Sequence, residues 1–274
     1  MIPAPFAYRR AESVEHSIEL LSEFGEDAKL LAGGHSLLPI MKLRLATPAV
    51  VIDLGSVPGL SYIRDEGGEI AIGALTRHVQ LEMSSLLRLQ VPLLRHAASA
   101  VGDCQIRHRG TIGGAVSHGD PAADIPAALM ALRATVVLQG PQGRRSMPID
   151  DFYLGFLETA LAADEVLVEI RVLRPGPAPW GFQKFRRRSI DWAIVGVAYQ
   201  GGDNPGIGLV NMGPTTIRAA TAEAAVLSGS ATEEVALLAD VEATPTADAA
   251  ASVAYRRHLS RVLLRRALAG EASS

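Results

Sequence analysis

The chain has 274 residues and a mass of 28.9 kDa, which suits one large domain or two smaller ones. Hydrophobic residues account for 48% of it, which excludes wholesale disorder, and no apolar run approaches the roughly 18 residues that span a bilayer. A formal net charge of -3 gives no electrostatic footprint for nucleic acid, and the single cysteine, Cys104, excludes an internal disulfide or an iron–sulfur cluster held by this chain alone. Residues 1–13 contain no apolar segment typical of a signal peptide, so we expect a cytoplasmic location.

Residues 1–55 predict a small α/β subdomain. We expect Ser13 to cap a helix that runs to about Phe24 and stops at Gly25, because apolar residues recur there at helical spacing. Two short apolar runs, Lys29–Ala32 and Val50–Leu54, predict strands.

Residues 56–174 predict a second subdomain that mixes short strands with helices. In chain order we expect a strand at Glu69–Gly73, a helix from its cap Thr76 to Met83, a helix at Pro92–Val101, a long polar and glycine-rich stretch at Gly102–Asp124, a helix at Ile125–Ala131, a hairpin formed by Thr135–Leu138 and Arg145–Ile149, and a strand at Glu165–Leu173.

A proline-rich linker at residues 175–179 precedes the C-terminal part, residues 180–274. Strand-like runs at residues 181–186, 193–199 and 207–211 are followed by two or three helices, the last at Ser252–Ala269. The arginines of that last helix are expected to form a solvated face or a partner surface: Arg256, Arg257, Arg261, Arg265 and Arg266.

Two glycine-containing segments are the strongest candidates for ligand binding. The first is Leu31-Ala32-Gly33-Gly34-His35-Ser36-Leu37-Leu38-Pro39, and the second is Arg109-Gly110-Thr111-Ile112-Gly113-Gly114-Ala115. Glycines let several backbone N–H groups converge on one anion, and Ser or Thr adds a donor. Facing each other, the two segments would enclose a pyrophosphate, although tight turns are the equal alternative. Neither matches a P-loop, and the dinucleotide pattern G-x-G-x-x-G is absent.

Three other residues each allow a structural and a functional interpretation. Asp124 is either the N-cap of the helix that follows it or an acceptor for ligand hydroxyls. Lys184 lies either on an exposed strand face or within reach of the first domain, and Trp192 is either a core residue or stacks near an aromatic cofactor. Cys104 is expected to be a small buried residue. The histidines lack metal-ligand spacing, so we expect no metal site.

Together these motifs resemble the FAD-binding subunit of molybdenum hydroxylases, which include aerobic carbon monoxide dehydrogenases and xanthine dehydrogenases. The resemblance rests on A-G-G-H-S at residues 32–36, T-I-G-G at 111–114, D-P-A-A-D-I-P at 120–126, E-V-L-V-E-I at 165–170 and F-x-K at 182–184, and it covers essentially the whole chain. It implies an α+β fold of the vanillyl-alcohol-oxidase or PCMH type. In that fold two α/β subdomains hold FAD between them, and a C-terminal domain packs a three-stranded antiparallel sheet against helices.

The resemblance also implies a set of cofactor-binding residues and no catalytic residue. The set is Ala32, Gly33, Gly34, His35, Ser36, Leu37, Thr111, Ile112, Gly113, Gly114, Ala115, Asp124, Leu167, Lys184 and Trp192. Both glycine segments would bind the pyrophosphate through backbone amides. Asp124 would accept hydrogen bonds from ribityl or ribose hydroxyls, Leu167 would pack on the flavin or adenine, and Lys184 would approach the polar edge of the flavin. Ala115 departs from the family, which often has Asn there, and this leaves one side-chain hydrogen bond open.

The implied function is electron transfer within a complex, expected to be a dimer of heterotrimers. A large partner with a molybdenum cofactor oxidises the substrate, a small partner with two [2Fe–2S] clusters passes electrons to FAD, and FAD passes them to an external acceptor. A stand-alone flavin oxidase and a nucleotide-binding protein without redox activity remain alternatives. The substrate and the acceptor are not readable from this chain. Peripheral association with the inner face of the membrane is compatible with the expected cytoplasmic location.

Overall fold

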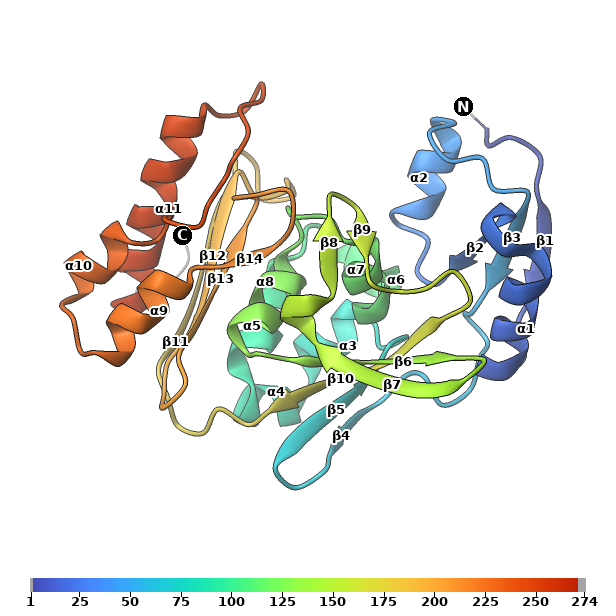
Figure 1. The fold of residues 1–274 in the computed structure, drawn as a ribbon, viewed down its shortest axis with the longest axis horizontal. Coiled ribbons are helices and arrows are strands. Elements are labelled where there is room, and N and C mark those ends of the chain that lie inside the picture. Colours follow the sequence, from blue (N-terminus) through green and yellow to red (C-terminus); the bar gives the residue numbers. More distant parts are fainter. Residues whose placement is uncertain (1, 271–274) are drawn as a thin grey trace.

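The computed structural model describes residues 2–270, in which three larger sheets with their helices follow one another along the long axis of the molecule, and a two-stranded hairpin is a fourth, small sheet (Figure 1). The first part holds a parallel sheet of order β1-β3-β2, built from β1 (Ala7–Arg10), α1 (Val14–Phe24), β2 (Ala28–Leu31), α2 (Leu37–Lys42) and β3 (Val50–Asp53). Ser13 accepts a hydrogen bond from the N–H of His16 at 3.0 Å and Gly25 ends α1, which confirms the predicted helix.

The central part holds an antiparallel sheet of order β4-β5-β10-β6-β7 and most of the helices. In chain order its elements are β4 (Ile63–Asp65), β5 (Glu69–Gly73), α3 (His78–Met83), α4 (Ser85–Gln90), α5 (Pro92–Ala100), α6 (Cys104–Arg109), α7 (Ile112–His118), α8 (Asp124–Ala131), β6 (Thr135–Gly140), β7 (Gly143–Pro148), the hairpin β8 (Tyr153–Gly155) and β9 (Glu158–Thr159), and β10 (Val166–Leu173).

Strand β10 is the middle strand of the central sheet, and it contributes apolar side chains to both faces of that sheet. Val166 and Val168 pack with the first part of the chain, whereas Ile170 and Val172 belong to the main core under the helices. A register shift between Leu167 and Glu169 allows this change of face. The central sheet therefore joins two cores.

Two predictions for the central part were wrong in detail. The stretch Gly102–Asp124 contains the short helices α6 and α7, each with its own cap. Asp103 accepts from the N–H of Gln105 at 2.9 Å, and Thr111 accepts from the N–H of Gly114 at 3.1 Å. Helix α3 begins after Arg77 rather than after Thr76, whose hydroxyl is bonded elsewhere.

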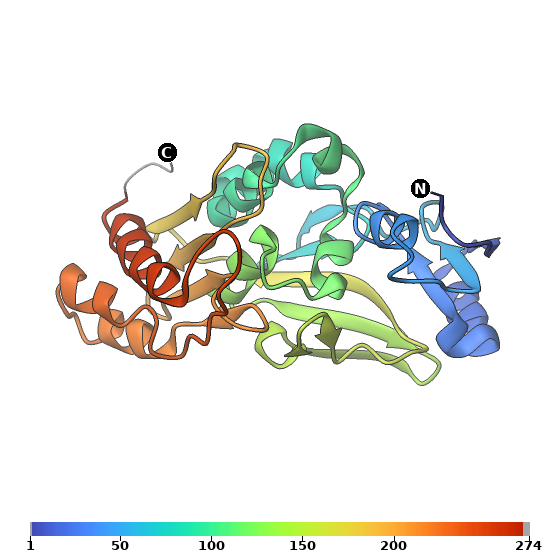
Figure 2. The same cartoon turned by 90° about the horizontal axis from the view of Figure 1, so that it is seen from above.

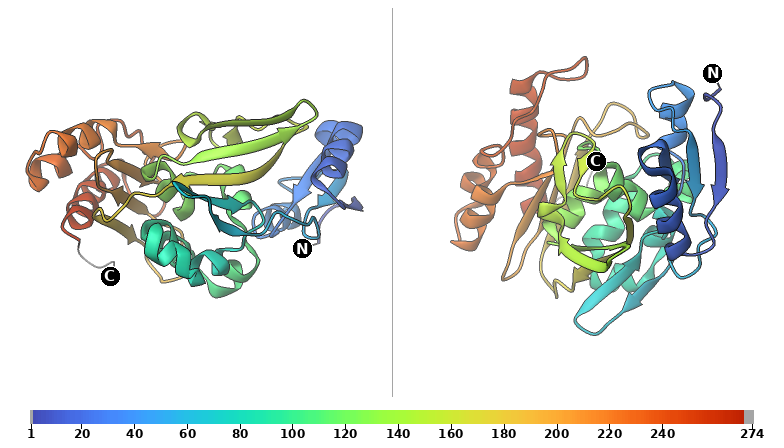
Figure 3. Two further views of the ribbon diagram at one scale, coloured as in Figure 1. Left: turned by 90° about the horizontal axis from the view of Figure 1, so that it is seen from below. Right: turned by 45° about the vertical axis from the view of Figure 1, so that its right-hand side comes forward.

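The C-terminal part is an antiparallel sheet with helices on its outer face (Figures 2 and 3). It consists of β11 (Trp180–Phe185), β12 (Val195–Gln200), β13 (Gly206–Val210), β14 (Ile217–Arg218), α9 (Ala220–Leu227), α10 (Thr232–Leu237) and α11 (Val253–Leu268). The three long strands are those predicted, and the two-residue strand β14 adds a short fourth one at the edge. No helix within residues 2–270 is long and apolar enough to cross a membrane.

Helix α8 lies between the central sheet and the C-terminal sheet, and all of its residues are buried. Strand β13 lies directly on the helix backbone at two glycines. A Cβ atom at Gly206 would lie 2.0 Å from the carbonyl oxygen of Ala131, and one at Gly208 would lie 2.0 Å from that of Ala127. Only glycine permits this approach, so these two positions set the spacing between the sheet and the helix.

The arginines of α11 form the expected solvated face only in part, since Arg261 and Arg265 are exposed but Arg256 is not. Arg256 is 2% exposed, and it donates to the carbonyl of Ile194 and to the carboxylate of Asp248. Arg257 and Arg261 both pair with the buried carboxylate of Asp240. Carboxylates that are distant in sequence thus turn part of this basic stripe into internal ion pairs.

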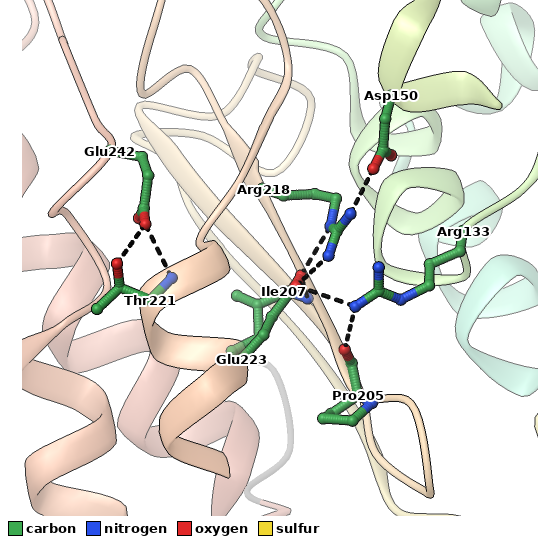
Figure 4. A network of polar contacts seen from close by, with 8 residues as sticks. All are labelled: Arg133, Asp150, Pro205, Ile207, Arg218, Thr221, Glu223 and Glu242. Atoms are coloured by element: carbon green, nitrogen blue, oxygen red, sulfur yellow. Dashed lines mark hydrogen bonds and ion pairs between the residues drawn. The ribbon is translucent and has the colours of Figure 1, made fainter. Parts of the chain in front are cut away.

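A second ionic network joins the central and C-terminal parts (Figure 4). The buried carboxylate of Glu223 on α9 accepts from the N–H of Ile207 at 2.8 Å, from Arg133 at 3.1 Å and from Arg218. Arg218 also pairs with Asp150 of the central part. Glu223 therefore forms ion pairs with Arg133 of the central part and with Arg218 of the C-terminal part.

Glu223→Gln is expected to lower the free energy of unfolding by about 3 kcal/mol, because a buried network that loses one charge leaves its partners uncompensated. The matched control is Glu242→Gln in the same region. Glu242 is exposed and accepts from the N–H and the hydroxyl of Thr221 at 2.8 and 2.5 Å, so its loss should cost no more than about 1 kcal/mol. Urea denaturation of both variants measures the difference, and equal losses would contradict the importance of the network.

Candidate functional site

A cleft of about 580 Å³ lies where the three parts of the chain meet. Of the residues assigned by resemblance, all except Ile112 line it. Ile112 is fully buried beneath the second glycine segment. The site thus draws together segments from residue 32 to residue 192, and both sides of the linker contribute to it.

The first glycine segment presents open backbone donors to the cleft. It leaves β2, turns at Gly34 with φ of +78°, and continues into α2. Within residues 2–270, no acceptor pairs with the N–H groups of residues 33–37, all of which line the cleft. His35 is exposed. Ser36 is the N-cap of α2, but its hydroxyl accepts no hydrogen bond from an N–H group of that helix. A run of amides without protein acceptors is suited to an anion.

The second glycine segment differs, because most of its amides are already used within the protein, and only the N–H of Thr111 has no acceptor among the described residues. Ile112 donates to the carbonyl of Thr76 at 2.9 Å, Gly113 donates to that of Ala74 at 2.8 Å, and Gly114 donates to the hydroxyl of Thr111. The expectation that both segments offer amides fits residues 33–37 of the first segment, and in the second segment it fits only the N–H of Thr111. The second segment mainly shapes the cleft, because Gly114 and Ala115 form part of its wall. Gly113 lies so close to Ala74 that a Cβ atom at position 113 would be 2.6 Å from the alanine Cβ.

The two segments touch each other at their glycines. A Cβ at Gly33 would lie 2.3 Å from the carbonyl oxygen of Arg109 and 2.8 Å from the Cα of Gly110. Any larger residue at position 33 would push the segments apart.

A buried ion pair stands at the end of the cleft that faces the C-terminal part. Lys184 Nζ on β11 lies 2.6 Å from Asp124 Oδ2 and also donates to the carbonyl of Ala100 at 3.1 Å. The side chains of Lys184 and Asp124 are only 3% and 6% exposed, so the exposed-strand interpretation of Lys184 was wrong. Asp124 is the first residue of α8 and Ala123 is its N-cap, so the cap interpretation was wrong too.

Asp124 keeps an unused acceptor. Its Oδ1 atom is buried and has no hydrogen-bond partner among the described residues. Burial raises the pKa of Asp124 to about 6, while the neighbouring Lys184 opposes the rise. At neutral pH the group is thus mostly a carboxylate with one unpaired oxygen, which suits a hydroxyl donor from a ligand.

The remaining predicted residues are divided between the wall and the mouth of the cleft. Leu167 is 5% exposed and lines the wall. Trp192 also lines the cleft but is 57% exposed, so it is not a core residue. Cys104 is exposed at the start of the surface helix α6, and its predicted burial was therefore wrong.

Sequence reasoning missed His78, which lines the cleft and is 5% exposed. Its Nδ1 has no partner among the described residues, and its ring packs against Gly110. Burial lowers the pKa of His78 to about 4, and the nearby charges of Arg107 and His35 add to this effect. Metal-ligand spacing in the sequence gives no signal for a single neutral imidazole packed against a glycine.

The geometry fits an elongated ligand with an anionic centre. Open amides lie at the first glycine segment, and an unpaired carboxylate oxygen lies toward the C-terminal part. The wall also contains aliphatic side chains of the first and central parts, among them Leu30, Leu54 and Leu75. These are the surfaces that a dinucleotide-like molecule requires, with planar groups on apolar walls and phosphates at the amides.

The comparisons with known proteins agree over the whole chain. A family model described as the FAD binding domain in molybdopterin dehydrogenase matches residues 4–175, and one described as the CO dehydrogenase flavoprotein C-terminal domain matches residues 180–270. The carbon monoxide dehydrogenase medium chain of Hydrogenophaga pseudoflava is 41% identical over 98% of this chain and 97% of that one.

Solved structures give the same result. The structure of carbon monoxide dehydrogenase from Hydrogenophaga pseudoflava, in a form lacking the Mo-pyranopterin moiety, matches with a TM-score of 0.95, covering 98% of both chains. Quinoline 2-oxidoreductase from Pseudomonas putida 86 matches with a TM-score of 0.91 at 30% identity, covering 98% of this chain and 97% of that one.

Gly33→Ala is expected to abolish FAD binding or weaken it at least a hundredfold, because the new methyl group would collide with the backbone at Arg109 and Gly110. Gly68→Ala is the matched control, since a Cβ there meets no atom within 4 Å and Gly68 has no positive φ. Titration of each apo chain with FAD measures the affinity. Normal FAD binding by Gly33→Ala would show that the contact between the two segments is not required.

His78 is expected to make the folded chain sensitive to acid. Its pKa of about 4 lies below the ordinary 6.5, so its contribution to stability is complete above pH 6.5 and is lost as the pH falls toward 4. Over that window wild type should lose about 3 kcal/mol more than His78→Gln, since one pKa unit corresponds to about 1.4 kcal/mol. Urea denaturation of both proteins at pH 7 and pH 4 tests this, and parallel losses would rule out His78 as the cause.

Proposed function

Because the chain belongs to the family of FAD-binding subunits of molybdenum-dependent dehydrogenases, we propose that its cleft holds FAD and that the chain is the electron-transfer flavoprotein of a heteromeric molybdenum hydroxylase. The observation that carries this function is one continuous cleft that combines open amides, apolar walls and an unpaired buried carboxylate oxygen. Neither a P-loop nor the dinucleotide pattern G-x-G-x-x-G occurs in the chain.

The proposed contacts follow from these groups. The N–H groups of residues 33–37 bind the pyrophosphate, and Asp124 Oδ1 accepts from a hydroxyl of the ribityl chain or ribose. Lys184 keeps Asp124 ionised by its charge and fixes the carboxylate in place. Leu167 supplies an apolar surface for a planar ring, and Trp192 covers the mouth of the cleft.

Bound FAD supplies the chemistry, because it stores two electrons and exchanges them one at a time. The residues of this chain bind, orient and shield it. The aliphatic wall excludes water from one side, while the buried pair of Asp124 and Lys184 provides a fixed charge distribution in a region of low dielectric. No side chain of this chain has to act as a general base.

The electron donor must come from another subunit. Cys104 is the single cysteine, and one thiolate cannot hold a [2Fe–2S] cluster. We propose a small iron–sulfur subunit and a large molybdenum-cofactor subunit as partners, assembled as a dimer of heterotrimers in the cytoplasm. The strong likeness to a carbon monoxide dehydrogenase medium chain supports a complex of that architecture. The substrate is chosen by the molybdenum subunit, since relatives that act on carbon monoxide and on quinoline share this fold.

A stand-alone oxidase is a weaker candidate. Such an enzyme needs a domain that binds an organic substrate over the flavin. The residues after the linker instead form a compact sheet whose inner face is covered by α8 and whose outer face is covered by α11.

The experiment is to co-express the chain with the products of its neighbouring reading frames and purify it. We expect the isolated chain to bind FAD, with absorbance near about 370 and 450 nm. In the complex, a substrate of the molybdenum subunit should bleach this absorbance under anaerobic conditions, whereas the isolated chain should not respond. A chain that never takes up flavin, or that is reduced by substrate without partners, would overturn the proposal.

A further inference from the structure

The second glycine segment is held by a backbone brace, the segment Ala74–His78. The carbonyls of Ala74 and Thr76 accept from Gly113 and Ile112 at 2.8 and 2.9 Å, and the N–H of His78 donates to the carbonyl of Gly110 at 3.0 Å. Arg77 and Thr111 form an antiparallel bridge within the same contact. The brace thus holds the second segment through three backbone hydrogen bonds, at Gly110, Ile112 and Gly113.

Thr76 connects this brace to the rest of the central part. It is fully buried and does not line the cleft. Its hydroxyl donates to the carbonyl of Tyr62 at 2.9 Å and accepts from the N–H of the same residue at 3.1 Å. Tyr62 is in turn anchored by a 2.5 Å hydrogen bond from its phenol to the buried carboxylate of Glu169.

The contacts continue from the brace to the open amides. Thr76 positions Ile112 and the second segment, and Gly110 of that segment packs directly against Gly33 of the first. Since the amides of residues 33–37 have no protein acceptors, their direction depends on the surfaces against which the first segment packs. A displacement of the second segment would therefore change the direction of the N–H groups of residues 33–37, with which Thr76 makes no hydrogen bond.

We propose that Thr76 is a positioning residue for the cofactor site, and that its hydroxyl sets FAD affinity by holding the second glycine segment against the first. The inference rests on FAD binding in the cleft. It assigns a role in binding to a residue that does not line the cleft. The side chain required is a hydroxyl that both donates and accepts, which Ser retains and Val lacks.

The test compares three variants of the full-length chain. Thr76→Val keeps the shape and loses both hydrogen bonds to Tyr62, and Thr76→Ser keeps the hydroxyl. Thr216→Val is the matched control, because Thr216 is 2% exposed but its hydroxyl has no partner among the described residues and lies outside the cleft. FAD dissociation constants are measured by fluorescence titration, well below the melting temperature of each variant.

Thr76→Val should raise the dissociation constant at least tenfold, whereas Thr76→Ser should remain within about threefold of wild type and Thr216→Val should not change it. A purely structural role would lower the melting temperature of Thr76→Val and leave the affinity of the folded protein unchanged. If Val is not tolerated, Thr76→Ala removes the same two bonds and is compared in the same way.

The outcomes separate two failures. If wild type takes up no FAD, the proposed function is wrong. If wild type binds FAD and all Thr76 variants bind it equally, the function stands and the positioning role of Thr76 is wrong.

Discussion

The fold depends on the complete burial of helix α8 between two sheets. Strand β13 can lie on the helix backbone only because Gly206 and Gly208 carry no side chain. The same contact brings β11 to the first turn of α8, where Lys184 meets Asp124 in a pocket that is almost closed to water. Burial makes this ion pair costly to break, since either partner alone would be an uncompensated charge. The packing of one helix thus determines both the domain arrangement and the charge at one end of the cleft.

The cleft is a product of all three parts of the chain, and its two glycine segments have different tasks. The first carries free amides, and the second is held by the brace and acts as a template for the first. This division follows from hydrogen-bond accounting: a backbone amide that already has a protein acceptor is not available to an anion. The glycines of the second segment are explained by close packing on Ala74 rather than by contact with a ligand.

The C-terminal part completes the site as well as covering α8. It supplies Lys184 to the interior and Trp192 to the mouth, so the shape of the cleft depends on the attachment of this part to the centre. The ionic network around Glu223 and the approach at the two glycines provide that attachment. A flavoprotein that receives electrons from another subunit needs a rigid site, because the distance between redox centres must not vary from one transfer to the next.

The sequence by itself determined the elements whose signals are local: the helix capped by Ser13, the long strands, the two glycine segments and their resemblance to one family. It was wrong for Arg256 and Cys104 and left two interpretations open for Lys184 and Trp192, because the burial of a long or isolated side chain is set by segments distant in sequence. The choice between a helix cap and a ligand acceptor at Asp124 also depended on a lysine 60 residues away. Only the tertiary structure decided which amides remain free, since the N–H groups of Ile112 and Gly113 are taken by carbonyls of the brace at Ala74–His78. Those of Gly114 and Ala115 are taken locally, by the hydroxyl and the carbonyl of Thr111.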